Sequence, residues 1–146
     1  MDEALKLAAQ AEALGDVPVG AVVLHEGRVI GRGHNRREAD EDPTAHAEIL
    51  ALREASAVLG SWRLIECTLV VTLEPCPMCL AASQQARVSK VVYGASDPKG
   101  GALSLGYRLH EDQRTNHRFE VIHEPNEACS QILKEFFRKR RSGASG

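Results

Sequence analysis

The stretch from Cys67 to Cys79 constrains the fold more than any other part of the chain. Residues 67–73 form a near-continuous apolar run, which is typical of a strand at the centre of a sheet covered on both faces. A Pro-Cys-Pro-x-Cys segment follows, and Pro77 suits the first position of a helix, where its missing N–H is not needed. The sequence therefore predicts a central strand that leads into a helix N-terminus, with Cys76 and Cys79 at the junction.

Helical and strand patterns alternate along the rest of the chain. Helices are expected at 2–14, 45–59, 77–85 and 126–141, and strands at 17–24, 28–31, 67–73, 88–94 and 119–122. Thr44 is the expected N-cap of the second helix. Gly20 indicates either a simple bulge or a close approach by a ligand. This order predicts an α/β domain with about five strands and helices on both faces of the sheet.

Length and composition predict an ordinary soluble enzyme-sized domain. The chain has 146 residues, of which 43% are apolar and 26% charged, and no apolar run is long enough to span a bilayer. The acidic N-terminus does not resemble a signal peptide, so a cytoplasmic location is expected. We expect one domain over residues 1–141 and a disordered tail over 142–146. Cys67 and Cys129 are expected to be small buried side chains.

Two short motifs predict a metal site. Cys76 and Cys79 can bring two sulfurs to one ion, and His46 is the candidate third ligand. Three protein ligands leave a position for water, as in catalytic zinc sites, and Glu48 could then move protons without binding the metal. The alternatives are a redox pair of cysteines, or a structural zinc completed by a fourth ligand. Cys67 and His34 are the candidates for that fourth ligand.

His-x-Glu followed by Pro-Cys-x-x-Cys is similar to the signature of zinc nucleobase deaminases. Beyond this signature, nearly the whole chain resembles bacterial tRNA-specific adenosine deaminases, within the cytidine deaminase-like superfamily. The resembling blocks are residues 17–21, 33–36, 42–49, 72–79, 91–95, 97–101, 116–118 and 136–138. The resemblance implies the three-layer α/β/α cytidine deaminase-like fold, with a mixed sheet. It also implies hydrolytic deamination of the wobble adenosine in a tRNA anticodon loop, which gives inosine and ammonia.

The same resemblance implies roles for particular residues. One zinc ion per chain would be held by His46, Cys76 and Cys79, and Glu48 would shuttle the proton. Asn35 would contact the flipped nucleoside, although an Asn in a loop is more often a turn residue. The RNA would be held by residues of the C-terminal helix, and the enzyme would be a homodimer. These RNA-binding candidates are Phe137, Arg138 and Arg141.

The basic run at 138–141 has two readings on the sequence alone: it could attract phosphates, or it could be a solvated helix end. The chain departs from the family at 80–86, near the expected dimer face, and at 102–106. Two rival functions use the same motifs. The first is a deaminase of a free base or nucleoside, such as guanine, cytosine or cytidine. The second is a non-catalytic RNA-binding subunit with a structural zinc, and an intact Glu48 argues against it.

Overall fold

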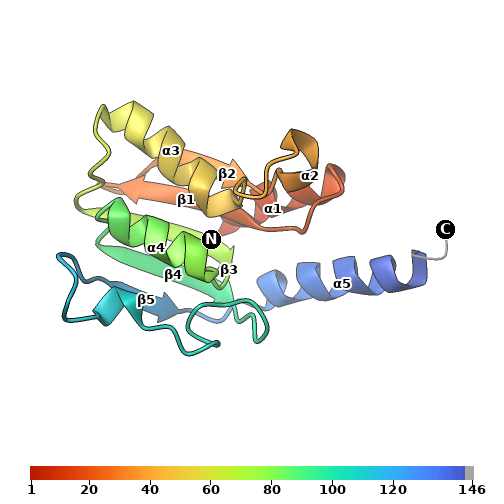
Figure 1. Cartoon of the computed structure of the whole chain (residues 1–146). Helices are drawn as coiled ribbons and strands as arrows, with labels where there is room; N and C mark the ends of the chain where they lie inside the picture. Colours follow the sequence, from red (N-terminus) through yellow and green to blue (C-terminus); the bar gives the residue numbers. More distant parts are fainter. Residues whose placement is uncertain (144–146) are drawn as a thin grey trace.

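The structure, a computed structural model, describes residues 1–143 and contains one mixed five-stranded sheet (Figure 1). The strands are β1 (Gly20–His25), β2 (Arg28–His34), β3 (Cys67–Leu73), β4 (Lys90–Ala95) and β5 (Glu120–His123). The helices are α1 (Asp2–Ala13), α2 (Arg37–Asp40), α3 (Ala47–Leu59), α4 (Pro77–Gln85), the 3₁₀ turn η1 (Leu109–Glu111) and α5 (Glu127–Gly143). The expected central strand, β3, has the predicted bounds.

The sheet has the strand order β2-β1-β3-β4-β5. β1 and β2 form an antiparallel hairpin whose turn residues, Glu26 and Gly27, both have positive φ, as turns between twisted antiparallel strands require. β1 also runs antiparallel to β3, whereas β3, β4 and β5 are parallel to one another. Parallel neighbours need crossover connections. α4 makes the first crossover, and the segment containing η1 lies in the second.

Helices cover both faces of the sheet, which confirms the predicted three-layer arrangement. α3 packs on β1 and β2 and also contacts α4, whereas α1 and α5 contact each other and lie on the opposite face (Figure 1). Alternate residues of β3 serve the two layers. Leu69 and Val71 belong to the main core cluster, whereas Val70 packs with Leu7 of α1. Among the described residues, no helix is long and apolar enough to cross a membrane.

Glycines in the hairpin allow the helices to approach the sheet closely. A Cβ at Gly20 would lie 2.0 Å from the backbone oxygen of Ala4 in α1. A Cβ at Gly33 would similarly lie 2.2 Å from the backbone oxygen of Ala47 in α3. The register shift in this hairpin lies between Val23 and Leu24. The irregularity of the hairpin is therefore not at Gly20, and the group that closely approaches Gly20 in the structure is the backbone of α1.

Three local expectations need correction. α3 begins at Ala47 with His46 as its N-cap, rather than at Ala45 with Thr44 as its N-cap. The hydroxyl of Thr44 instead donates to Asp42 Oδ1 at 2.7 Å, so it is not available to the helix. The loop expected after β2 contains the short helix α2. α5 continues through Ser142 and Gly143, which were assigned to the tail, and residues 144–146 of that predicted tail lie outside the described residues.

Candidate active site

Two helix N-termini meet at the carboxyl end of β3. His46 is the N-cap of α3, and Cys76 is the N-cap of α4, with Pro77 in the first turn as predicted. Both N-cap residues have extended backbone, so their side chains project from positions just before the first turn of each helix. Asn35 Oδ1 accepts the backbone N–H of Ala47 at 2.9 Å and so caps α3 from a distant loop. The positive ends of both helix dipoles therefore favour anionic groups here.

His46, Cys76 and Cys79 form a cluster that could hold a metal ion. Their ligand atoms all lie within 4.8 Å of one another. His46 Nδ1 is 3.6 Å from Cys76 Sγ and 3.6 Å from Cys79 Sγ. Within the described part of the chain, neither Cys67 nor His34 joins this cluster. Cys67 Sγ lies instead 3.6 Å from the carbonyl oxygen of Ile65.

Glu48 lies beside the cluster and is only 4% exposed. Burial raises the pKa of Glu48 to about 7, and a Cys76 thiolate contributes to the same effect. The hydrogen bond from the Cys79 thiol lowers the pKa of Cys76 to about 4, against the effect of burial. The same hydrogen bond, together with burial, raises the pKa of Cys79. The hydrogen bond to Cys76 raises the pKa of His46.

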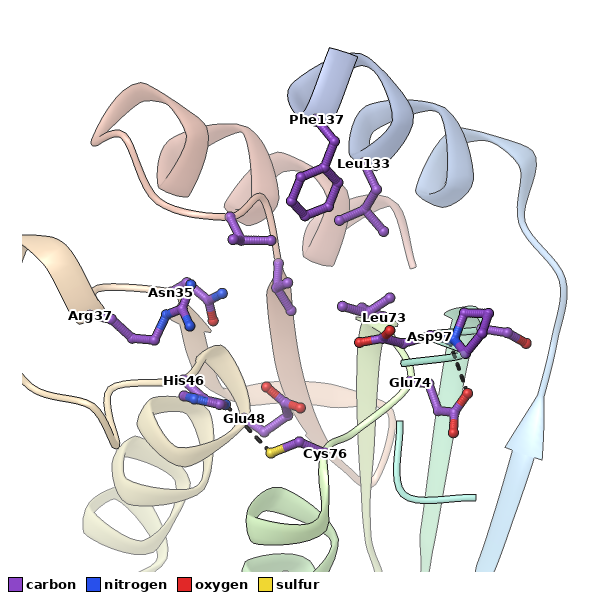
Figure 2. Close-up of a pocket in the computed structure, with 14 residues that line it drawn as sticks. Asn35, Arg37, His46, Glu48, Leu73, Glu74, Cys76, Asp97, Leu133 and Phe137 are labelled. Atoms are coloured by element: carbon purple, nitrogen blue, oxygen red, sulfur yellow. Dashed lines mark hydrogen bonds between the residues drawn. The ribbon is translucent and has the colours of Figure 1, made fainter. Parts of the chain in front are cut away.

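These groups open into a pocket of about 380 Å³ (Figure 2). It is lined by Val17, Val19, Asn35, Arg37, His46, Glu48, Leu73, Glu74, Cys76, Ser96, Asp97, Pro98, Leu133 and Phe137. Asn35 is 6% exposed, and its carbonyl oxygen is used in capping α3. The amide nitrogen of Asn35 has no hydrogen-bond partner among the described residues, so it is available to a ligand. The pocket thus combines a His/Cys/Cys cluster that could hold a metal ion, an acid and an amide donor with apolar walls, as ligand sites commonly do.

Glu74 anchors one wall of this pocket. The carboxylate is 3% exposed and accepts hydrogen bonds from the backbone N–H groups of Asp97 at 3.0 Å and Ser104 at 2.8 Å. The Ser104 hydroxyl also donates to Glu74, at 2.7 Å. A Cβ at Gly101 would lie 2.1 Å from Glu74 Cδ, so the loop passes directly over the acid. Glu74 therefore links the 97–104 loop to the short segment between β3 and Cys76.

The three RNA-binding candidates of α5 lie in different surroundings in the structure. Phe137 lines the pocket, and it also lines an adjacent groove together with Asp97, Lys99, Arg140 and Arg141. Arg138 does not line either, and its guanidinium pairs with Glu135 at 2.9 Å. The structure thus places Phe137 in the wall of the pocket and Arg141 in the adjoining groove, whereas Arg138 lines neither.

Sequence reasoning did not single out Arg37, Glu74, Lys99 or Arg140 as site residues. Glu74 comes immediately before the Pro-Cys motif, and Lys99 lies in the 97–101 block that resembles the family. A charged residue inside a motif is a signal that could have identified Glu74. Arg37 has no such local signal, because its partner Asp16 lies 21 residues earlier in the chain.

Comparisons with known proteins point to one family. The model of the MafB19-like deaminases matches residues 1–141. A tRNA-specific adenosine deaminase of Bacillus subtilis is 49% identical over 142 residues, which is 97% of this chain and 88% of the relative. A solved structure from studies of A-to-I editing by tRNA:A34 deaminases at the wobble position of transfer RNA has a TM-score of 0.85. That match is 43% identical and covers 91% of this chain and 97% of the other.

A guanine deaminase of Nitrosomonas europaea is also similar in structure. It has a TM-score of 0.74 and 27% identity, and the match covers 92% of this chain and 81% of the other. The similarity is therefore higher, in both sequence and structure, to the proteins described as acting on tRNA than to this enzyme of a free base.

Proposed function

We propose the function of this chain from one premise: it belongs to the MafB19-like deaminase family, and relatives at 44–49% identity are tRNA-specific adenosine deaminases. The chain is a tRNA adenosine deaminase, a hydrolase that acts on a C–N bond of a cyclic amidine. It converts the wobble adenosine of an anticodon loop to inosine and releases ammonia. The observation that carries this function is the buried Glu48 beside the cluster of His46, Cys76 and Cys79.

Zinc is the metal that fits this cluster best. One imidazole and two thiolates are typical zinc ligands, and three protein ligands are typical of catalytic zinc. These three side chains would hold the ion, because their ligand atoms lie close enough together to share one. Both nitrogen–sulfur distances in the cluster are 3.6 Å. Zinc in such a site lowers the pKa of a bound water to about 7 and so supplies hydroxide at neutral pH.

Glu48 is the proposed general acid and base. Its carboxylate takes a proton from the attacking water and returns it to the adenine, so that the exocyclic amine leaves as ammonia. The oxygen of water remains on the ring carbon, which gives inosine. Glu48 stands two residues after His46 in the first turn of α3, so it reaches the same space as the metal ligands without belonging to their cluster.

Asn35 and α5 are proposed to bind the substrate. The unpartnered amide nitrogen of Asn35 faces the pocket, where it can donate to the flipped nucleoside (Figure 2). Extraction costs less for a loop adenosine than for a paired base. Phe137 offers a ring for stacking at the pocket mouth, and Arg141 offers a cation in the adjoining groove. Arg138 remains a weaker candidate, since it pairs with Glu135.

Three further properties are proposed from the resemblance. Residues 1–141 form one deaminase domain, as a single sheet with helices on both faces supports. The enzyme works in the cytoplasm, where a tRNA-modifying enzyme meets its substrate. It forms a homodimer, and an apolar groove supports self-association. That groove lies between α3 and α4 and contains the half-exposed Trp62.

The deciding experiment compares an anticodon stem-loop RNA bearing the wobble adenosine with free adenosine, guanine and cytidine. We expect inosine and ammonia from the stem-loop and little turnover of the free compounds. Elemental analysis of the same preparation should find one zinc per chain. Robust turnover of a free base together with an inert stem-loop would instead assign the chain to the second candidate class. That candidate is a guanine- or cytidine-type deaminase, and the structural similarity to a guanine deaminase supports it.

A further inference from the structure

Arg37 is a cation in the pocket wall that the proposed chemistry does not use. It begins α2, and Figure 2 shows its side chain at the pocket on the same side as Asn35 and His46. The side chain is 40% exposed. A positive group near a metal site does not help to bind the metal, so its position needs another explanation.

Asp16 fixes Arg37 in this place. The Asp16 side chain is completely buried, and its Oδ1 accepts Arg37 Nη2 at 3.1 Å and Nε at 3.3 Å. The same carboxylate also accepts the backbone N–H groups of Val17 at 2.8 Å and Glu38 at 3.1 Å. Asp16 thus joins the loop after α1 to α2, and it holds the guanidinium by one edge.

A purely structural role does not account for Arg37. Asp16 already has two backbone donors, so its charge has partners without the guanidinium. The Nη1 group of Arg37 has no partner among the described residues, although a guanidinium has donors on both edges. The neighbouring Arg36 behaves differently: it is 39% exposed, pairs with Asp40 at 3.0 Å and does not line the pocket. Because Asp16 binds one edge of the Arg37 guanidinium, the other edge, with Nη1, is available to a ligand.

That ligand must be anionic, and the proposed function identifies its chemical class. An adenosine within RNA has a phosphodiester on each side, whereas a free base has none. We propose that Arg37, positioned by Asp16, binds a backbone phosphate adjacent to the target adenosine. This proposal rests on the RNA substrate proposed above. Lys99, Arg140 and Arg141 line the groove next to Asp97, which lies across the pocket from Arg37 in Figure 2. Cations thus stand on both sides of the adenosine site, where its two phosphates would lie.

The test compares Arg37→Ala with Arg36→Ala, which removes the same charge from an equally exposed neighbour. Binding of a fluorescent anticodon stem-loop is measured over a range of salt concentrations. We expect Arg37→Ala to bind roughly 10- to 100-fold more weakly. Its salt dependence should be shallower by about 0.7 in log–log slope, as for one lost phosphate contact on a single strand. Arg36→Ala should stay near wild type. Equal affinities and slopes for the two variants would overturn the proposal.

A second arm needs no protein variant and so does not depend on how Arg37→Ala folds. Stem-loops carry a neutral methylphosphonate at the phosphate before or after the wobble adenosine. Wild type should lose affinity at one of the two sites, and Arg37→Ala should be insensitive at that same site. If the losses at both sites were the same in wild type and in Arg37→Ala, no phosphate contact would depend on Arg37 and the proposal would be wrong. Adenosine 5′-monophosphate is included to separate a nucleotide phosphate from an RNA backbone phosphate, and we expect little turnover of it.

These experiments distinguish a failure of the proposed function from a failure of the proposed phosphate contact. If wild type neither binds nor deaminates the stem-loop, the proposed function is wrong. If wild type does both and Arg37→Ala matches Arg36→Ala, only the phosphate contact is wrong.

Discussion

Glu48 is the single residue whose removal should separate chemistry from binding. It is buried beside the metal-binding cluster without belonging to it. We expect Glu48→Ala to retain zinc and RNA binding and to lose ammonia release by roughly 10²- to 10⁴-fold, which is the usual contribution of a general acid or base. Elemental analysis, a binding assay and an ammonia assay check the three parts. Glu54→Ala, an exposed acid on the same helix, is the matched control. Normal turnover by Glu48→Ala would show that another group moves the proton.

Asp16 should contribute to stability in a pH-dependent way. Burial tends to raise the pKa of Asp16, but hydrogen bonds from Glu38, Val17 and Arg37 outweigh it, and the pKa is lowered. A lowered pKa means that the stabilisation is complete above the ordinary value of about 3.9 and is lost as the pH falls through the folded value. We expect Asp16→Asn to lower the unfolding free energy by about 1.5–3 kcal/mol at neutral pH. The difference from wild type should shrink in acid.

Urea unfolding at several pH values measures this effect. Glu54→Gln, which also removes one negative charge but from an exposed site, should give a small difference that hardly varies over the same range. A difference for Asp16→Asn that stayed constant down to the acid limit would mean that ionisation of Asp16 is not the source of the stabilisation.

Among the structural elements, the 97–104 loop depends on one close contact with the end of β3. Glu74 accepts hydrogen bonds from Asp97 and Ser104, and Gly101 lies directly against its carboxylate. We expect Gly101→Ala to destabilise the protein by about 1–3 kcal/mol, because a methyl group must displace a buried, fully bonded acid. For a protein of this size the melting temperature should fall by roughly 2–4 °C per kcal/mol. Stem-loop turnover should fall as well, since the loop forms a pocket wall.

The control for this loop is Gly100→Ala. A Cβ at Gly100 would lie 2.9 Å from Asp97 Oδ2, which is the far end of a side chain that can rotate. Its effect on the melting temperature should therefore be much smaller. If both substitutions were equally mild, the contact between Gly101 and Glu74 would not be a constraint on the loop.

For the molecule as a whole, the distribution of charge is more informative than its net value of −2. Cations gather around the pocket mouth on elements far apart in the sequence: Arg37 on α2, Lys99 in a loop, and Arg140 and Arg141 on α5. Such local positive potential attracts phosphates even to a protein of slightly negative net charge. Within the basic run of α5, Arg140 and Arg141 line the groove, whereas Arg138 forms an intrahelical ion pair.

The proposed self-association concerns the whole molecule and can be tested at the groove between α3 and α4. Trp62 lines this groove and is 54% exposed, whereas Val58 of α3 is 60% exposed and lies outside it. We expect wild type to have the mass of a dimer in light scattering. Trp62→Glu should shift it toward the monomer by placing a charge in the apolar interface, and Val58→Glu should not. A wild-type monomer, or dimers of all three proteins, would rule out this face as the dimer interface.

The sequence by itself determined the features that depend on neighbouring residues. The apolar run of β3 and Pro77 at the start of α4 are local, and the structure contains both where they were expected. The His-x-Glu and Cys-x-x-Cys motifs are each local as well, although 30 residues separate His46 from Cys76. Local chemistry was sufficient there because ligand type and helix position are set within a few residues. The three-layer architecture also followed, since the order of helices and strands allows few arrangements.

Only the tertiary structure decided which distant residues complete the site. Asn35 caps α3 in place of Thr44, Asp16 holds Arg37 at the pocket, and Glu74 fixes the loop at Ser104. Each contact joins segments separated by 12 to 30 residues, and none is marked by a periodic pattern. Such contacts form because a buried polar group needs a partner. Which group supplies that partner depends on how the helices and loops pack against the sheet.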